Sequence, residues 1–277
     1  MRLAIVSDIH ANLEALRATL ASVSADGVDS LLCLGDIVGY HADPEECIAL
    51  LRRFDPVCVA GNHDRAVAGR ITTEGFSADA AKGVAWTRER LSAGAMRFLA
   101  GLPRDASVGG AVVAVHGALL PEGGCEMTRL DTCERKRRAF EALATHPSGA
   151  RVCAFGHTHR LGIHELRGGV VRSRAGDEVA LRDDALYLIN PGTVGQPRTD
   201  ERRATYVVLD TARRTASIRR VEYDIAPALE KARKAGLLPP PSSPSSPVRA
   251  AAGRALRRLG LHGQVKRLLR SVRRGAT

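Results

Sequence analysis

The sequence lacks any apolar run long enough to cross a membrane, which takes about 20 consecutive apolar residues. Charge also arrives at Arg2, too early for the apolar core of a secretory signal peptide followed by a cleavage site. No Cys-x-x-Cys pair occurs among the six cysteines, and Cys33, Cys58 and Cys153 lie inside apolar runs. Together these absences argue against membrane, secreted and disulfide-rich proteins, and they predict a cytoplasmic protein with reduced thiols.

Acidic residues are also missing, but only from one part of the chain. The whole sequence of 277 residues carries 41 basic and 30 acidic side chains, a net charge of +11. No acid follows Glu230, whereas residues 231–277 contain 12 of the basic residues. Residues 1–230 therefore hold 29 basic and 30 acidic side chains, so the positive charge belongs to the C-terminal part alone.

Composition divides the chain into three segments. We expect a domain over residues 1–237, a Pro/Ser-rich extended linker over 238–247, and a basic tail over 248–277. The tail fits a solvated extension, and it also fits a basic amphipathic helix on an anionic membrane surface or along a nucleic-acid backbone. Aromatic residues, which would stack on bases or anchor the tail at an interface, are absent from it.

One pattern recurs along the chain. A short apolar run ends in a small or polar residue that leads into side chains of metal-ligand type, and the runs concerned are 3–7, 31–35, 57–61, 111–115 and 152–156. Continuous apolar runs without polar alternation are typical of strands that are covered on both faces. These five runs therefore predict buried strands, each followed by a polar loop.

The spacing of apolar residues predicts the remaining elements. Helices are expected over 12–24, 44–52, 77–99 and 127–145. Further strands are expected over 162–166, 185–189, 205–209 and 216–221. An α/β first half followed by a β-rich second half predicts one domain of two packed sheets with helices outside.

The side chains at the five strand ends are of the types that bind metal ions: Asp8, His10, Asp36, Asn62, His63, His116, His157 and His159. In open α/β sheets the ligand crevice lies beyond the carboxyl ends of the strands, so we expect these residues to converge. Carboxylate, imidazole and amide oxygen together suit Mn²⁺, Fe²⁺ or Zn²⁺, and they are too many for one ion. Two ions about 3.5–4 Å apart would form a hydrolytic pair, which leaves one histidine free to neutralise a leaving oxygen.

Each of these residues has a simpler interpretation when it is taken alone. Asp8 and Asp36 could cap helices, Asn62 could occupy a turn, and His116 could be a core histidine. No such interpretation explains two aspartates together with five histidines at matching positions. The combination therefore favours metal binding.

Five motifs occur in the order and spacing of the calcineurin-like metallophosphoesterases: Asp8-x-His10, Gly35-Asp36-x-x-Gly39, Gly61-Asn62-His63-Asp64, His116-Gly117 and Gly156-His157-Thr158-His159. Residues 1–236 resemble this superfamily, and the stretches 7–13 and 190–198 are similar to its small bacterial and archaeal phosphodiesterase-type members. The resemblance implies an α/β fold, a four-layer αββα sandwich of two mixed β-sheets flanked by helices. This agrees with the fold expected from the elements.

The resemblance also implies a role for each residue of the motifs. One metal ion would be held by Asp8, His10 and His159. The other would be held by Asn62, His116 and His157, and Asp36 would bridge the two. His63 would bind no metal and would assist the leaving group, which makes His63 and Asp36 the implied catalytic residues. The implied cofactor is a pair of divalent ions, with Mn²⁺ expected first and Fe, Zn or Ni as alternatives.

The implied activity is hydrolysis of a phosphomonoester or phosphodiester by a water or hydroxide that the metal pair holds. After Asp36 the chain lacks the Asp and Arg of the eukaryotic protein-phosphatase branch, and Asp64 stands where that branch has Glu. These departures favour a small phosphoester as the substrate. Two alternatives are a phosphoprotein phosphatase and a non-catalytic scaffold of this fold whose basic tail binds nucleic acid or membrane.

Substrate identity is the part that the motifs constrain least. Specificity is expected to depend on the loops 40–46, 64–80, 117–130 and 191–200. Asn12, Arg65 and Arg198 flank motif loops and are candidate substrate contacts. His41 follows Gly39-Tyr40 and is expected at the surface, at the border of the site.

Overall fold

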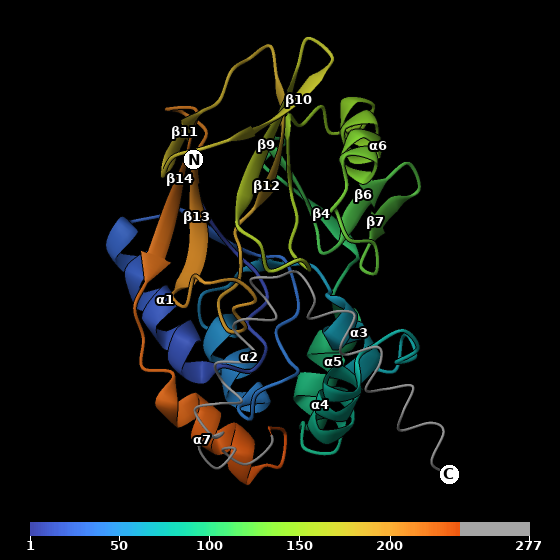
Figure 1. Cartoon of the computed structure of the whole chain (residues 1–277), viewed down its shortest axis with the longest axis vertical. Coiled ribbons are helices and arrows are strands. Elements are labelled where there is room, and N and C mark those ends of the chain that lie inside the picture. Colours follow the sequence, from blue (N-terminus) through green and yellow to red (C-terminus); the bar gives the residue numbers. More distant parts are fainter. Residues whose placement is uncertain (239–277) are drawn as a thin grey trace, which may run out of the picture. The chain divides into compact units, whose positions relative to one another are not determined.

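The computed structural model describes residues 1–238 (Figure 1). The predicted tail and the predicted linker, apart from Leu238, lie outside the described residues, so both stay predictions. Among residues 1–238, no helix combines the length and the apolar character that a membrane span requires. The six cysteines are free thiols, and Cys33, Cys58 and Cys153 are buried.

Two mixed six-stranded sheets form the centre of the domain (Figure 1). Sheet A contains, in spatial order, β11 (Glu178–Ala180), β14 (Thr215–Val221), β13 (Ala204–Asp210), β1 (Arg2–Val6), β2 (Ser30–Cys33) and β3 (Val57–Cys58). Sheet B contains, in spatial order, β10 (Val170–Arg174), β9 (Gly162–Arg167), β12 (Leu186–Asn190), β8 (Val152–Ala154), β5 (Val112–Val115) and β4 (Asp105–Val108). A separate hairpin pairs β6 (Ala118–Leu120) with β7 (Gly123–Cys125). The three strands β1, β2 and β3 run parallel, as do β5, β8 and β12, so their carboxyl ends lie at common edges.

Helices cover the outer faces of both sheets. The helices of the described region are α1 (Leu13–Asp26), α2 (Pro44–Arg52), α3 (Asn62–Val67), α4 (Ala78–Arg88), α5 (Ala93–Gly101), α6 (Cys133–Ala144) and α7 (Ala226–Lys234). Side chains fix where several of them begin: Asn12 accepts a hydrogen bond from the backbone N–H of Ala15 at the start of α1, and Thr132 caps α6 in the same way. Gly27 ends α1 in the left-handed conformation that glycine tolerates best.

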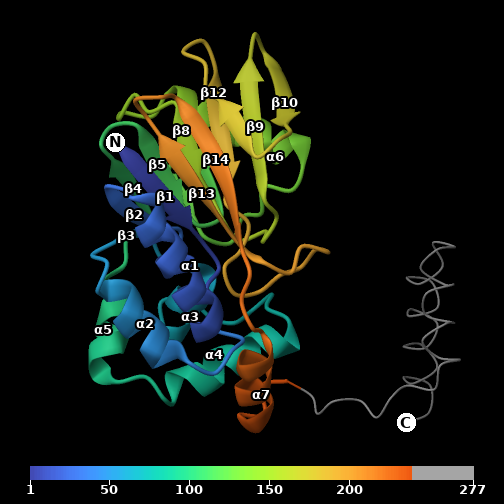
Figure 2. The same ribbon diagram turned by 90° about the vertical axis from the view of Figure 1, so that its left-hand side faces the viewer.

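The apolar runs are continuous because the central strands are buried on both faces. In β1, Leu3 and Ile5 pack between the two sheets, whereas Ala4 and Val6 pack against α1 and its neighbours. Leu188 of β12 packs on the far side of sheet B, in the cluster that α6 closes. The layers are therefore helices, sheet A, sheet B and helix, which confirms the predicted four-layer αββα sandwich (Figure 2).

Two of the predicted helices have the wrong extent. Residues 77–99 form two helices, because Ser92 caps a new one and Glu45 binds both the hydroxyl and the backbone N–H of Ser92. The helix expected over 127–145 begins only at Cys133, and the residues before it form a loop that lies close against Gly117. The sequence does not predict α3, which has six residues and is too short to show helical periodicity, and it does not predict α7.

Candidate metal centre

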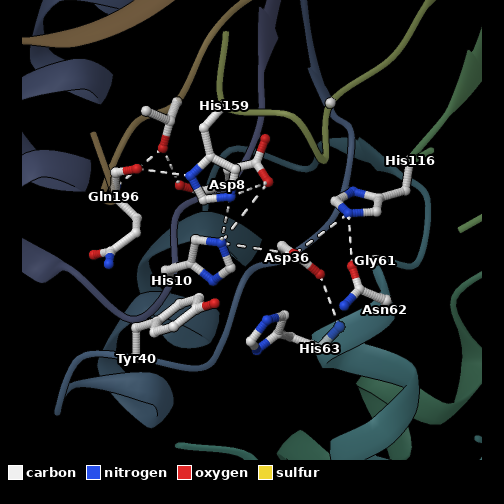
Figure 3. Close-up of polar contacts among 12 residues, drawn as sticks. Asp8, His10, Asp36, Tyr40, Gly61, Asn62, His63, His116, His159 and Gln196 are labelled. Atoms are coloured by element: carbon white, nitrogen blue, oxygen red, sulfur yellow. Dashed lines mark hydrogen bonds and ion pairs between the residues drawn. The ribbon is translucent and has the colours of Figure 1, made fainter. Parts of the chain in front are cut away.

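The loops that follow β1, β2, β3, β5 and β8 meet at one edge of the sandwich, where both sheets contribute (Figure 3). All the predicted ligand-type residues converge there: Asp8, His10, Asp36, Asn62, His63, His116, His157 and His159. Each is buried apart from His157, which is half-buried. Residues up to 151 positions apart in the chain thus form a single polar cluster inside an otherwise apolar fold.

The backbone at the strand ends aims these side chains inward. Asp8, His10 and Asp36 have φ of 55°, 52° and 52°, and His157 and His159 have φ of 62° and 57°. Residues other than glycine rarely adopt this left-handed conformation. Gly156 allows a close approach, because a Cβ atom there would lie 1.9 Å from the hydroxyl oxygen of Ser7. The chain therefore turns sharply below the cluster.

The first group of side chains contains Asp8, His10 and His159. The Nε2 atom of His159 lies 3.2 Å from Asp8 Oδ1 and 3.2 Å from His10 Nε2. Both carboxylate oxygens of Asp8 are buried and have no hydrogen-bond partner among residues 1–238. A buried carboxylate is stable only when it is paired or coordinates a metal.

The second group contains Asn62, His116 and His157, and Asp36 lies between the two groups. The Nε2 atom of His116 is 3.1 Å from Asn62 Oδ1, and the rings of His116 and His157 are 5.1 Å apart. Asp36 Oδ2 lies 3.6 Å from His10 Nε2 and 3.3 Å from His116 Nε2. A single carboxylate oxygen therefore faces both groups.

Three histidines are oriented by backbone carbonyl groups. The Nδ1 atoms of His10, His116 and His159 lie 3.1, 2.7 and 2.6 Å from the carbonyl oxygens of Val38, Leu34 and Gln196. A carbonyl oxygen only accepts, so each Nδ1 carries a proton, and the neutral form of each ring has its lone pair at Nε2. The Nε2 atoms of His10 and His159 then face each other as two acceptors at 3.2 Å, an arrangement that a cation between them stabilises. The residues present therefore fit a metal ion.

The electrostatics of the metal-free cluster support the same conclusion. Burial lowers the pKa of His157 to about 3 and lowers that of His10 well below its usual value, so both rings are neutral, the form that binds metals. Burial acts on His116 in the same direction, but the charge of Asp36 outweighs it and raises the pKa of His116 to about 9. In the metal-free protein His116 is therefore protonated and paired with Asp36. A metal ion that binds His116 has to displace this proton.

Among residues 1–238, no hydrogen bond to a backbone carbonyl orients the ring of His63, in contrast to the rings of His10, His116 and His159. The backbone N–H of His63 donates to Asp36 Oδ1 at 2.9 Å, and its ring packs against Tyr40 and Phe76 with centroids 4.8 and 5.2 Å away. The Nδ1 atom is buried, has no hydrogen-bond partner in the described part of the chain, and lies against Gly39, where a Cβ atom would come within 2.4 Å of it. Nε2 is therefore the ring nitrogen that is open to the cleft.

A cleft of about 300 Å³ lies over the cluster. Its floor includes Asp36, Asn62, His63, His157 and His159, and its walls are formed by Tyr40, Gly75, Phe76, Ser77, Ala80, Met127, Arg129 and Arg198. Each of the four loops expected to set specificity contributes at least one of these residues. Two other hollows, of about 220 and 530 Å³, contain none of the clustered aspartates or histidines.

The predicted substrate contacts have different fates. Arg198 lines the cleft and donates a hydrogen bond to the hydroxyl of Tyr40 at 3.1 Å. Asn12 is fully buried, where its side chain caps α1 and donates to the carbonyl of Gly195, and its contact with substrate stays a prediction. Arg65 forms an ion pair with the buried Glu126 at 2.8 Å and is absent from the cleft lining, and its contact with substrate stays a prediction as well.

Sequence reasoning misplaces His41 and misses several residues of the site. His41 is only 4% exposed, and its Nε2 atom contacts Gln196 Oε1 at 2.9 Å, so its expected surface position is wrong. Gln196 in turn orients His159 through its backbone carbonyl. Any residue could do this, so the residue type at this position does not predict the role. Four residues of the cleft walls were also missed, namely Tyr40, Phe76, Met127 and Arg129, because loop positions cannot be derived from spacing.

Comparison with known proteins gives consistent matches over most of the chain. The sequence pattern of the calcineurin-like phosphoesterase superfamily domain matches residues 1–214. An uncharacterized protein of Methanocaldococcus jannaschii is 33% identical over 232 residues, which is 83% of this chain and 90% of that protein. A solved metallophosphoesterase from Sphaerobacter thermophilus has 34% identity and a TM-score of 0.71, with 86% of this chain and 95% of that chain covered. A solved hypothetical protein from Pyrococcus horikoshii, 16% identical with a TM-score of 0.69 over 86% of this chain and 94% of that one, shares the fold.

Proposed function

The chain belongs to the calcineurin-like phosphoesterase superfamily and is a metal-dependent phosphoesterase, and from this premise we propose that it uses two metal ions to hydrolyse a small phosphomonoester or phosphodiester. One observation carries the proposal. Asp36 Oδ2 faces His10 on one side and His116 on the other, at 3.6 and 3.3 Å, as a carboxylate that bridges two ions would. A site for one ion would not explain why the carboxylate of Asp36 faces both groups of side chains.

The ligand assignment follows from the two groups of side chains. Asp8, His10 and His159 would hold one ion, and Asn62, His116 and His157 would hold the other, with Asp36 shared. Mn²⁺ is the first proposed metal, with Fe, Zn or Ni as alternatives, because a mixture of carboxylate, imidazole and amide oxygen suits divalent ions of this kind. Two divalent ions bound there would supply an activated water and would neutralise charge on the phosphoryl oxygens.

The remaining polar residues of the cleft act on the substrate itself. His63 presents Nε2 to the cleft and would donate a proton from that atom to the departing ester oxygen. Its backbone N–H holds Asp36 Oδ1, which leaves Oδ2 directed at the two groups of ligands. Arg198 lies on the Tyr40 side of the cleft and would contact an anionic oxygen of the substrate.

The size of the cleft favours a small substrate. A volume of about 300 Å³, walled by Phe76 and Met127, suits a small ester better than a folded phosphoprotein segment. A non-catalytic scaffold is disfavoured because every predicted ligand-type residue is present and convergent. The basic tail over 248–277 remains a proposed contact for nucleic acid or anionic membrane, and a cytoplasmic location remains a proposal too.

The proposed function is tested by assaying the full-length protein, loaded with Mn²⁺, against a panel of phosphomonoesters and phosphodiesters. We expect turnover of at least one small ester, loss of that turnover in EDTA, and recovery when Mn²⁺ is added back. A metal analysis of the loaded protein should give two ions per chain. Turnover that EDTA leaves unchanged would contradict metal dependence, and fewer than two ions without hydrolysis of any ester would favour the scaffold.

Replacing His157 and His159 one at a time should weaken metal binding at two different sites. His159→Ala removes a ligand of the Asp8 group, whereas His157→Ala removes one from the His116 group. We expect each variant to bind one Mn²⁺ normally and the other at least about 10- to 100-fold more weakly, because residues that merely orient ligands already have effects of this size. Calorimetric titration of Mn²⁺ measures both affinities. Equal loss of both ions in both variants would rule out the proposed assignment.

A further inference from the structure

Asp64 is a fully buried carboxylate beside the metal centre that the proposed reaction does not use. It is the third residue of α3, directly after His63. Its Oδ1 atom accepts hydrogen bonds from the backbone N–H groups of Ile37 and Val38, at 2.9 and 3.2 Å. Its Oδ2 atom accepts one from the backbone N–H of Gly61 at 3.0 Å. One side chain thus satisfies three backbone donors from two different loops.

These two loops carry residues that must be placed accurately against each other. The loop after β2 carries Asp36, and the loop after β3 leads into Asn62 and His63 at the start of α3. The loops touch backbone to backbone, because a Cβ atom on Gly61 would lie 2.2 Å from the backbone N of Asp36 and one on Gly35 would lie 2.3 Å from the backbone N of Gly61. No side chain fits between the two loops at Gly35 and Gly61. The loops are therefore held together by hydrogen bonds from side chains beside this contact.

Asp64 supplies those bonds from the α3 side. Its carboxylate joins the N–H groups just after Asp36 to the N–H just before Asn62, and the backbone N–H of His63 meets Asp36 Oδ1 beside it. Asp64 therefore acts together with this direct hydrogen bond to hold the loop of Asp36 close to His63. Catalysis is sensitive to displacements of about 1 Å between such groups.

We propose that Asp64 is a positioning residue, which locks the loop of Asp36 onto the start of α3 and so fixes the bridging carboxylate against Asn62 and His63. The proposal rests on the proposed hydrolytic roles of Asp36 and His63, and it goes beyond them by assigning the group that holds both in register. An ordinary helix-capping role predicts an effect on stability alone. A positioning role predicts an additional effect on metal affinity and on turnover.

The test uses a graded pair of variants in the full-length protein. Asp64→Asn keeps an oxygen for Ile37 and Val38 but turns an amide N–H₂ towards the N–H of Gly61, so one bond is lost. Asp64→Ala loses all three. The matched control is Glu165→Gln, which changes another buried carboxylate, 3% exposed and bound to the hydroxyl of Tyr187, in sheet B away from the centre.

Calorimetric Mn²⁺ titration, thermal unfolding and kinetics at saturating Mn²⁺ should be measured for each variant. We expect Asp64→Asn to lower kcat and Mn²⁺ affinity by about 10- to 100-fold, the usual effect of removing a group that orients ligands, with a smaller change in KM. Asp64→Ala should fall further, and Glu165→Gln should lose stability but keep its kcat and Mn²⁺ affinity. If Asp64→Ala does not fold, Asp64→Asn carries the test.

The proposal is overturned if Asp64→Asn loses stability while its kcat and its Mn²⁺ affinity match those of Glu165→Gln. Failure of the proposed function is a different outcome. If the wild-type protein hydrolyses no phosphoester, the hydrolytic proposal fails, whereas Mn²⁺ affinity still decides whether Asp64 positions the ligands. A fall in Mn²⁺ affinity confined to the Asp64 variants supports the positioning role in either case.

Discussion

Asp36→Asn is expected to lower kcat/KM by about a thousandfold or more, because it removes the charge that two metal ions would share. The amide keeps the shape of the carboxylate and can still accept the backbone N–H of His63, so the loop should stay in place. Its other terminal atom is then an N–H₂ group, which cannot bridge two cations. We therefore expect the variant to bind both Mn²⁺ ions more weakly and to turn over little substrate.

We expect Asp36→Asn to keep the fold, so that a loss of activity can be attributed to the metal site. In the metal-free protein the neighbouring His116 and His63 outweigh burial and hold the pKa of Asp36 well below its usual value, so the wild-type residue is ionised. Asp184→Asn is a suitable control, since Asp184 is an exposed carboxylate that pairs with Arg167 and Arg182. Circular dichroism, Mn²⁺ titration and kinetics would be compared. Two Mn²⁺ bound with wild-type affinity in Asp36→Asn would contradict the bridging role.

His63→Ala is expected to separate metal binding from turnover. His63 lies outside the proposed ligand groups, so we expect both Mn²⁺ ions to stay bound. Loss of a proton donor to the leaving oxygen should lower kcat by about 10²- to 10⁴-fold. The loss should be smaller for an aryl ester, whose leaving group departs without protonation, than for an alkyl ester. This dependence on the leaving group is the signature of a general acid.

A histidine outside the centre provides the control for this variant. His146 follows α6 and contacts Ser148, so His146→Ala removes an imidazole without touching the cleft. Equal losses for aryl and alkyl esters in His63→Ala would show that His63 binds substrate rather than donating a proton. Wild-type turnover would remove His63 from the mechanism. Loss of one Mn²⁺ would instead assign it to a metal, as its proximity to His10 and Asp36 allows.

The parts of the molecule that follow from local sequence were predicted well. The five apolar runs and the aspartates and histidines that follow them predicted the strands and the convergence of these side chains, because parallel strands share a carboxyl edge. The apolar runs have no polar alternation, because neighbouring residues such as Leu3 and Ala4 are buried on opposite faces of the sheet. This pattern predicted the layered fold. Periodicity and strand order suffice for this much.

The parts that depend on contacts between distant loops were not predictable. Asn12 and Arg65 flank motif loops in the sequence, yet the first is consumed by a helix cap and the second by Glu126. Gln196 orients His159 through a carbonyl group that every residue possesses. The break between α4 and α5 depends on Glu45, which binds Ser92 from 47 residues away. Such roles are decided by packing, which a linear pattern does not record.

The sharp turns at the strand ends have a consequence for how this chain can evolve. Among residues 1–238, nine residues other than glycine have positive φ, and seven belong to the loops of the metal centre: Asp8, His10, Ala11, Asp36, Tyr40, His157 and His159. Each such residue costs about 1–2 kcal/mol relative to an ordinary backbone conformation. Glycine would relieve that cost at any of these positions, but at five of them it would delete a proposed metal ligand. Selection for a more stable chain and selection for a metal-binding one therefore pull against each other at the same residues.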